Sequence, residues 1–147
     1  MATVDMSREY PVERKELWDQ LTDPEQLPTF YNNMIEAHSE RFTEPGDTVD
    51  VTYRLLGRNV AGTITLTDIV PGERLHVRGE IKGLPPVEHD WRYEDTDDGT
   101  RVSVRLETQE VESWLGRSLD RFLIPRQLEK DLSRSLDNID MILEVQP

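Results

Sequence analysis

A histidine and several aromatic residues share one face of a predicted strand, and these residue types are the ones in this sequence best suited to chemistry. In residues 87–93, apolar or aromatic side chains alternate with charged ones, which places His89, Trp91 and Tyr93 on one face. A histidine in an apolar cavity could transfer protons near neutral pH, or hydrogen-bond a carbonyl or hydroxyl of a ligand. Tyr53, on another strand, would add a phenol, so His89 and Tyr53 are the candidate catalytic residues. The alternative is that His89 is a hydrogen-bonded core or rim histidine and that the aromatic side chains only pack.

The other two histidines do not join His89. His76 alternates toward the outer face of its strand, and His38 is out of phase with Ile35 and Ala37. Neither H-x-H nor H-E-x-x-H occurs and the chain has no cysteine, so no metal site is predicted. The G-x-S-x-G nucleophile motif, a phosphate-binding glycine-rich loop and the dinucleotide fingerprint are also missing from the sequence. No cofactor and no serine hydrolysis are therefore predicted.

A few other side chains fall on or near the inward register. Arg8 and Arg41 are expected on inward faces, where a guanidinium could bind a ligand carboxylate or phosphate, or could extend to the rim. Asp68 lies so close to a turn that a rim or turn role is expected. Phe30 and Tyr31 follow a short helix and are expected to line a cavity entrance, or to pack beneath the loop.

Six predicted strands must position these side chains; they cover residues 35–42, 49–55, 60–70, 75–81, 87–94 and 101–107. Apolar and polar residues alternate in all of them except the first and the third, and the third is rich in Val, Thr and Ile. Turns are predicted at Pro71-Gly72 and near Gly99, where a positive φ is expected. Bulges are considered at Gly62 and Gly79. The face predicted to look inward consists of Val49, Val51, Tyr53, Leu55, Leu75, Val77, Ile81, Val87, His89, Trp91, Tyr93, Val102, Val104 and Leu106.

The chain begins with another strand, over residues 3–10, and then two short helices, over residues 12–21 and 27–31. Asp23 and Pro24 have the residue types of a helix start. The predicted order is strand, two short helices, six strands and a long helix. Short turns between consecutive strands favour an antiparallel meander, so the predicted fold class is α+β.

The long helix is predicted over residues 125–145, with Pro125 in its first turn. Its apolar residues recur at steps of three and four, which indicates one stripe that covers the sheet. The stripe consists of Leu128, Leu132, Leu136, Ile139 and Leu143. A second apolar cluster, which includes Trp114, Leu115, Leu119 and Phe122, faces another direction. A break or kink near Pro125 is therefore predicted, and the first segment is expected to form a separate flap, or a helix on another side of the core.

Composition limits the classes of partner. The chain has 147 residues and a net charge of −13, so it would repel nucleic acid and anionic membrane surfaces. It contains no apolar run of membrane-spanning length and no export signal, and with no cysteine a cytoplasmic protein is expected. Residues 1–147 are expected to form a single domain. The acidic surface is interpreted as an aid to solubility or an adaptation to a salty cytoplasm, with an acidic docking face as the alternative.

The sequence resembles the START-like superfamily of polyketide cyclases/dehydrases and lipid-transport proteins (SRPBCC), which has the helix-grip fold. The resemblance covers nearly the whole chain. It rests on Pro11-Val12 to Leu17-Trp18, Leu21-Thr22-Asp23-Pro24-Glu25, Ile69-Val70-Pro71-Gly72-Glu73-Arg74-Leu75, and Gly99-Thr100-Arg101-Val102 after a strand with Trp91 and Tyr93. It implies a curved antiparallel sheet wrapped around the long C-terminal helix, with a ligand cavity between them. The family has no shared catalytic motif to transfer to this chain.

The expected function is binding of a small hydrophobic molecule, aromatic, polyketide-like or acyl, in that cavity. An alternative is an enzyme of the cyclase, aromatase or dehydratase type, in which His89 and a tyrosine would move protons. A second alternative is a protein-interaction module with a collapsed cavity; a monomer and a homodimer both stay open. The predicted ligand contacts are Phe30, Tyr31, Tyr53, Leu55, Val77, His89, Trp91, Tyr93, Leu119, Phe122, Leu128 and Leu132.

Overall fold

The structure, a computed structural model, describes residues 2–55, 57–108 and 118–145, and of residues 2, 118–125 and 145 only the backbone. The elements follow along the chain as β1 (Ala2–Tyr10), α1 (Arg14–Leu21), the short 3-10 helix η1 (Pro24–Gln26), α2 (Leu27–Phe30), β2 (Met34–His38), β3 (Thr48–Leu55), β4 (Arg58–Val70), β5 (Arg74–Ile81), β6 (Val87–Asp95), β7 (Thr100–Thr108) and α4 (Ser118–Val145).

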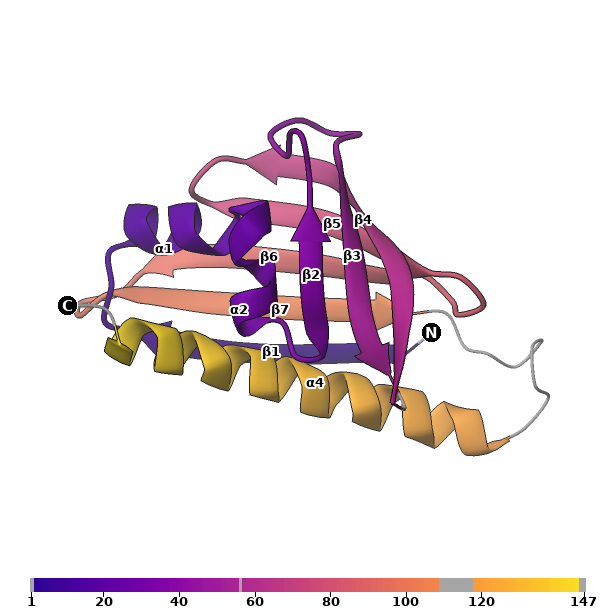
Figure 1. The fold of residues 1–147 in the computed structure, drawn as a ribbon. Helices are drawn as coiled ribbons and strands as arrows, with labels where there is room; N and C mark the ends of the chain where they lie inside the picture. The colour runs from indigo at the N-terminus through magenta and orange to yellow at the C-terminus, as the bar shows by residue number, and fades with distance from the viewer. Residues whose placement is uncertain (1, 56, 109–117, 146–147) are drawn as a thin grey trace.

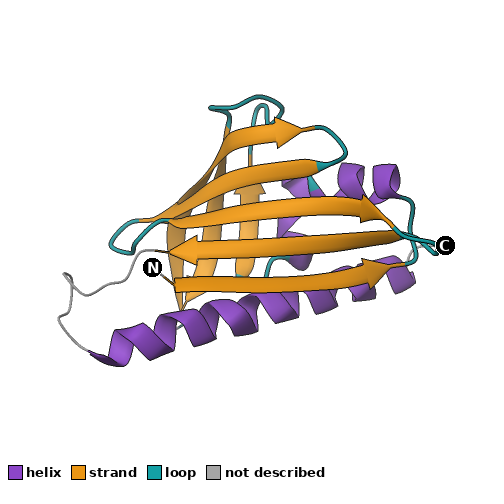
Figure 2. Cartoon of the chain, turned by 180° about the vertical axis from the view of Figure 1, so that it is seen from behind, coloured by secondary structure: helices purple, strands orange, loops and turns teal. Residues whose placement is uncertain are grey.

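The strands of the described residues form one antiparallel sheet in the order β1-β7-β6-β5-β4-β3-β2. Strands β2 to β7 each lie beside their neighbour in the sequence, as short connections favour. Figure 1 shows the sheet curving from β1 toward β2, with α4 along β1. The reverse view in Figure 2 shows the strands in front of α1 and α2. The structure confirms the predicted α+β, helix-grip-like arrangement.

Burial along the strands follows the predicted alternation. On β7 the side chains of Val102, Val104 and Leu106 are buried, whereas Arg101 and Arg105 on the other face are exposed and Ser103 is half-buried. Apolar residues on alternate positions leave water together only if they share one face of the sheet. The inward faces of the strands thus form the floor on which the helices pack.

Helix α1 contributes a compact apolar face to this core. Leu17, Trp18 and Leu21 are buried, and the Trp18 ring meets the Tyr93 ring edge-on with centroids 5.0 Å apart. The helix ends at Leu21, and Asp23 caps the next turn by accepting a hydrogen bond from the backbone N–H of Glu25.

The described strands contain two register shifts, and neither lies at a glycine for which a bulge was considered. Pairing is regular through Gly62 and Gly79, so neither glycine carries the bulge considered for it. One shift lies between Leu66 and Asp68. There Asp68 is exposed and its Oδ2 lies 2.9 Å from Arg74 Nη2, which places it at the turn as expected.

A second shift lies between Met34 and Glu36, at the start of β2. It changes the expected phase at the start of that strand, because Met34 is buried whereas Ile35 is 44% exposed, while Ala37 keeps its inward position. The strand also ends at His38 rather than at residue 42.

The turn between β6 and β7 needs a glycine for a different reason than predicted. Gly99 does not have the positive φ expected for it. Instead its Cα lies against the backbone of Tyr10, Pro11 and Val12 at the end of β1, where no side chain fits. The close approach of two chain segments, rather than the turn geometry, accounts for the glycine.

Helix α4 runs without interruption from Ser118 to Val145, so the predicted break near Pro125 is wrong. Proline removes one backbone hydrogen bond, and helix-forming residues on both sides continue the helix through it. Pro125 therefore lies inside the helix and not in its first turn. Of the predicted flap, Trp114 and Leu115 lie outside the described residues.

Polar contacts attach α4 to the rest of the fold at several points. The guanidinium of Arg8 pairs with Asp137 at 2.5 Å and donates to Ser133 Oγ. The hydroxyl of Tyr10 donates to the carbonyl of Leu136 at 2.9 Å. Arg8 therefore does point toward the helix, but its charge is already matched by a carboxylate of the protein.

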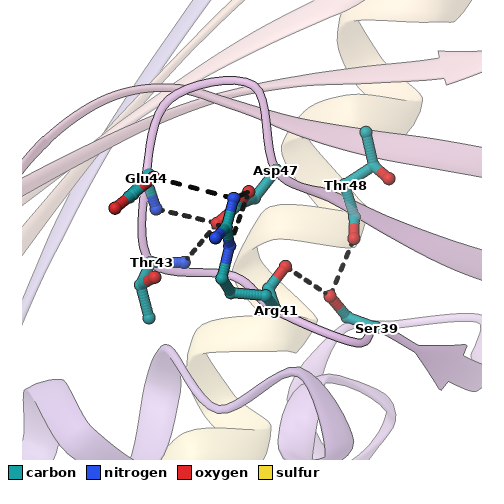
Figure 3. Close-up of polar contacts among 6 residues, drawn as sticks. All are labelled: Ser39, Arg41, Thr43, Glu44, Asp47 and Thr48. Carbon is teal, nitrogen blue, oxygen red and sulfur yellow. Dashed lines mark hydrogen bonds and ion pairs between the residues drawn. The ribbon is translucent and has the colours of Figure 1, made fainter.

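The connection between β2 and β3 is held by a small polar network (Figure 3). Asp47 accepts hydrogen bonds from the Arg41 guanidinium and from the backbone N–H groups of Thr43 and Glu44, and these contacts lower the pKa of Asp47 to about 2. Ser39 donates to the carbonyls of Arg41 and Thr48. The inward position predicted for Arg41 is wrong, because the chain has left the sheet at His38 and Arg41 lies in an exposed loop.

Candidate functional site: a cavity between the sheet and helix α4

A cavity of about 280 Å³ lies between α4 and the inward faces of β3, β5, β6 and β7. Its wall consists of Tyr31, Asn32, Asn33, Tyr53, Leu55, Gly79, Ile81, Leu84, Pro85, Val87, His89, Leu106, Thr108, Gln127, Leu128, Asp131, Leu132 and Ser135. Most of these side chains are apolar, and the polar ones come mainly from α4 and the segment before β2. The cavity can therefore surround an apolar molecule and meet it with a few polar groups.

The predicted ligand contacts divide into two groups in space. Those on the cavity wall are Tyr31, Tyr53, Leu55, His89, Leu128 and Leu132. Those behind the wall, in the packed core, are Phe30, Val77, Trp91 and Tyr93, each at most 3% exposed. Leu119 and Phe122 lie in α4, and their side chains are outside the described residues. A ligand role for each of these residues stays a prediction.

His89 lies on the wall because β6 places it opposite Val77 of β5 and Leu106 of β7. Its Nδ1 is enclosed and has no hydrogen-bond partner among the described residues. Gly79 leaves space next to the ring, since a methyl group there would lie 3.5 Å from His89 Nε2. The nitrogen that faces this space is therefore Nε2, whereas Nδ1 is enclosed by the protein.

Burial controls the protonation of this imidazole. Loss of hydration, with the nearby charge of His76 as the smaller cause, lowers the pKa of His89 to about 4. At neutral pH the ring is uncharged, with one nitrogen as a donor and the other as an acceptor. It is better suited to hydrogen bonding than to proton transfer, which is most efficient when the pKa lies near the working pH.

The lowered pKa of His89 predicts a pH-dependent loss of stability. The unfolded chain binds a proton near pH 6.5, whereas the folded chain binds it only near pH 4. The free energy of unfolding is therefore unaffected by this group above pH 6.5 and falls as the pH drops toward 4, by at most about 1.4 kcal/mol per pH unit. From pH 7.5 to 5.0, the unchanged protein should lose about 2 kcal/mol more than His89→Leu in urea unfolding. An equal decrease in the free energy of unfolding of the unchanged protein and of His89→Leu would contradict this prediction.

A cluster of three aromatic side chains, Phe30, Tyr31 and Trp91, lies next to His89. The Tyr31 ring centroid is 6.3 Å from that of His89 and 5.9 Å from that of Trp91, and Phe30 packs on Tyr31 at 4.8 Å. Burial raises the pKa of Tyr31, and it raises that of Tyr53 to about 12. Both phenols keep their protons at neutral pH, so they can donate hydrogen bonds.

A polar group at the rim of the cavity was not predicted from the sequence. Asn32 and Asn33 precede β2, while Gln127, Asp131 and Ser135 follow one another at steps of four on α4. Ser135 Oγ accepts from the backbone N–H of Asn32 at 2.9 Å and donates to the carbonyl of Asp131. The spacing on α4, next to the apolar stripe, was the available signal. No pattern in the sequence indicated that Asn32 and Asn33, far away in the chain, would join these residues of α4.

The other sequence candidates lie away from the cavity. His76 faces outward, where it contacts Thr67 and lies 3.7 Å from Glu88. His38 is exposed at the end of β2. Within residues 2–55, 57–108 and 118–145, no three acidic or histidine side chains group as a metal site would require. No helix of the described residues is long and apolar enough to span a membrane.

Comparisons with known proteins agree with this architecture. The family described as polyketide cyclase / dehydrase and lipid transport matches residues 1–144, and the chain belongs to this family. No curated protein matches the sequence.

Solved structures with the same fold share little sequence with the chain. Protein CV1439 from Chromobacterium violaceum is 14% identical, with a TM-score of 0.78 over 99% of both chains. CalU16 from Micromonospora echinospora is 19% identical, with a TM-score of 0.68 over 95% of this chain and 74% of its own. DynU16, from the dynemicin biosynthetic locus, is 18% identical, with a TM-score of 0.73; 99% of this chain aligns with 48% of DynU16. At these identities the similarity establishes the fold.

Proposed function

We propose that this protein binds a small, mainly apolar molecule in the cavity between the sheet and α4. The observation that carries the proposal is the cavity of about 280 Å³ with largely apolar walls. Apolar surface gains free energy when it leaves water, so an apolar ligand would be driven into this space. The family to which the chain belongs includes lipid-transport proteins, which supports the same role.

The state of His89 favours binding over acid–base catalysis. An uncharged imidazole whose Nε2 lies next to the space at Gly79 can exchange a hydrogen bond with a ligand carbonyl or hydroxyl. Such a bond would orient the ligand without proton transfer. The cavity also argues against the interaction module, which would have a collapsed interior.

The first test is native mass spectrometry of the protein purified from its own host, followed by extraction of bound molecules. A discrete apolar adduct is expected. A mass of the bare chain, together with no binding of added 1-decanol by calorimetry, would contradict the proposal.

The variant Gly79→Val tests whether the ligand occupies this cavity. A Cβ at Gly79 would lie in ordinary van der Waals contact with His89, and the methyl groups of valine would extend beyond it into the cavity that Gly79 lines. A strand also accepts valine better than glycine, so the stability should be kept or improved. We expect the dissociation constant of 1-decanol to rise about tenfold or more, because the added side chain takes the ligand's volume.

Glu80→Val is the matched control, because it places valine on the outer face of the same strand. It should leave decanol binding unchanged. Equal affinities for Gly79→Val and the unchanged protein would show that the ligand binds elsewhere.

The enzyme alternative is favoured by one observation, namely that His89 and Tyr53 share the cavity wall. A cyclase or dehydratase would require a proton donor and a proton acceptor within hydrogen-bond reach of the reacting atoms. Under this alternative, His89→Gln would abolish turnover of a polyketide-like substrate while its binding persists. Under the binding proposal, the same variant weakens binding.

A further inference from the structure

The described wall of the cavity has one ionised group, and it lies at the rim. Asp131 of α4 is partly buried, while Asn33 and Gln127 beside it are exposed. No lysine or arginine is among the described wall residues, and His89 is uncharged at neutral pH. A molecule in the cavity therefore meets a negative charge at the mouth and no positive charge on the described wall.

The two oxygens of the Asp131 carboxylate have different surroundings. Oδ1 accepts hydrogen bonds from Asn32 Nδ2 at 2.8 Å, Gln127 Nε2 at 3.0 Å and Asn33 Nδ2 at 3.5 Å. These amides come from two separate segments and hold the carboxylate in one position. No described residue donates to Oδ2, so this oxygen can accept a hydrogen bond from a molecule in the mouth.

We propose that the ligand is an amphiphile whose polar end donates a hydrogen bond to Asp131, as an alcohol or an amine can, and that Asp131 disfavours ligands with an anionic end. This inference rests on the proposed function and specifies the ligand of the same cavity. A hydroxyl or ammonium group can donate to Oδ2, whereas a carboxylate can only accept and is repelled. The net charge of −13 adds to the repulsion of anions.

The remainder of the wall agrees with this orientation. With its polar end at Asp131, a ligand would extend its apolar part past Leu128 and Leu132 of α4 toward Val87 and Leu106 on the sheet. Burial of that part would supply the affinity, and the rim would select the polar end.

The test compares three ligands with the same ten-carbon chain, namely 1-decanol, decylamine and decanoate, by calorimetry at pH 7.5 and low ionic strength. We expect decanol and decylamine to bind about tenfold or more tightly than decanoate. Added salt should narrow the difference between decanol and decanoate, because it screens the charge of Asp131.

The variant Asp131→Asn examines the role of this residue directly. The amide carbonyl can keep the three hydrogen bonds of Oδ1, while the amide nitrogen replaces Oδ2 and turns an acceptor into a donor. The affinity of decanoate relative to decanol should rise about tenfold or more. Glu129→Gln removes the same charge from an exposed position of the same helix and should leave the ratio unchanged. Thermal unfolding shows that each variant is folded.

The outcomes separate the two proposals. Equal affinity of decanoate and decanol for the unchanged protein, or an unaltered ratio in Asp131→Asn, would overturn the inference about the headgroup and leave the binding proposal standing. No binding of any of the three ligands would overturn the binding proposal and this inference with it.

Discussion

The variant Gly99→Ala is expected to have a free energy of unfolding about 3 kcal/mol lower than the unchanged protein. A methyl group at this position would overlap the carbonyl oxygen of Tyr10, and it would lie 2.9 Å from both the Cα of Pro11 and the backbone nitrogen of Val12. All three are backbone atoms, so none can move aside by a change of rotamer. The turn would have to separate from the end of β1, where Tyr10 pairs with Thr100. Urea unfolding followed by circular dichroism measures the loss.

Gly72→Ala serves as the control for the loss of a glycine in a turn. Gly72 has a φ of +79° and open space around its Cα, so alanine there meets strain but no clash. We expect a loss of about 1 kcal/mol. A loss at Gly99 no larger than the loss at Gly72 would show that the contact with β1 is not the reason for the glycine.

The variant Leu136→Ala should lower the free energy of unfolding by about 3 kcal/mol. Leu136 lies in the middle of the buried stripe of α4, between Leu132 and Ile139, and its side chain is 0% exposed. Alanine would leave an apolar void that the helix cannot close by moving, because Tyr10 and Arg8 attach it on the same stretch. The same unfolding experiment measures the effect.

Met141→Ala is the matched control on the same helix. Its side chain is 61% exposed, so truncation should change the free energy of unfolding by less than about 0.5 kcal/mol. Comparable losses for Leu136→Ala and Met141→Ala would contradict the assignment of the buried face.

Of the two positions in these stability predictions, the burial of Leu136 can be predicted from the sequence, whereas the contact that requires Gly99 cannot. The stripe that contains Leu136 recurs every three or four residues, and that local pattern predicts the buried face of a helix. The need for glycine at position 99 arises from Tyr10 and Pro11, which are almost ninety residues away. The local pattern predicted the turn at Gly99 correctly. The reason inferred for the glycine, a positive φ, was wrong.

The candidate site shows the same division. Alternation predicted that His89, Trp91 and Tyr93 face inward, and the structure places all three on that face. Alternation could not predict that His89 meets open space while Trp91 and Tyr93 meet other side chains. That difference depends on Gly79 and Phe30, which other parts of the chain bring beside them.

The order of the elements, most of the faces they bury and the family could be predicted from the amino-acid sequence, because these follow from periodic patterns and local motifs. Three features became known only from the folded chain: α4 is continuous through Pro125, Arg8 pairs with Asp137, and Asp131 accepts a hydrogen bond from Asn32 at the cavity mouth. The two pairings depend on contacts between segments far apart in the chain. Residue periodicity reports which side of an element is apolar, whereas the partner on that side is set only when the elements pack.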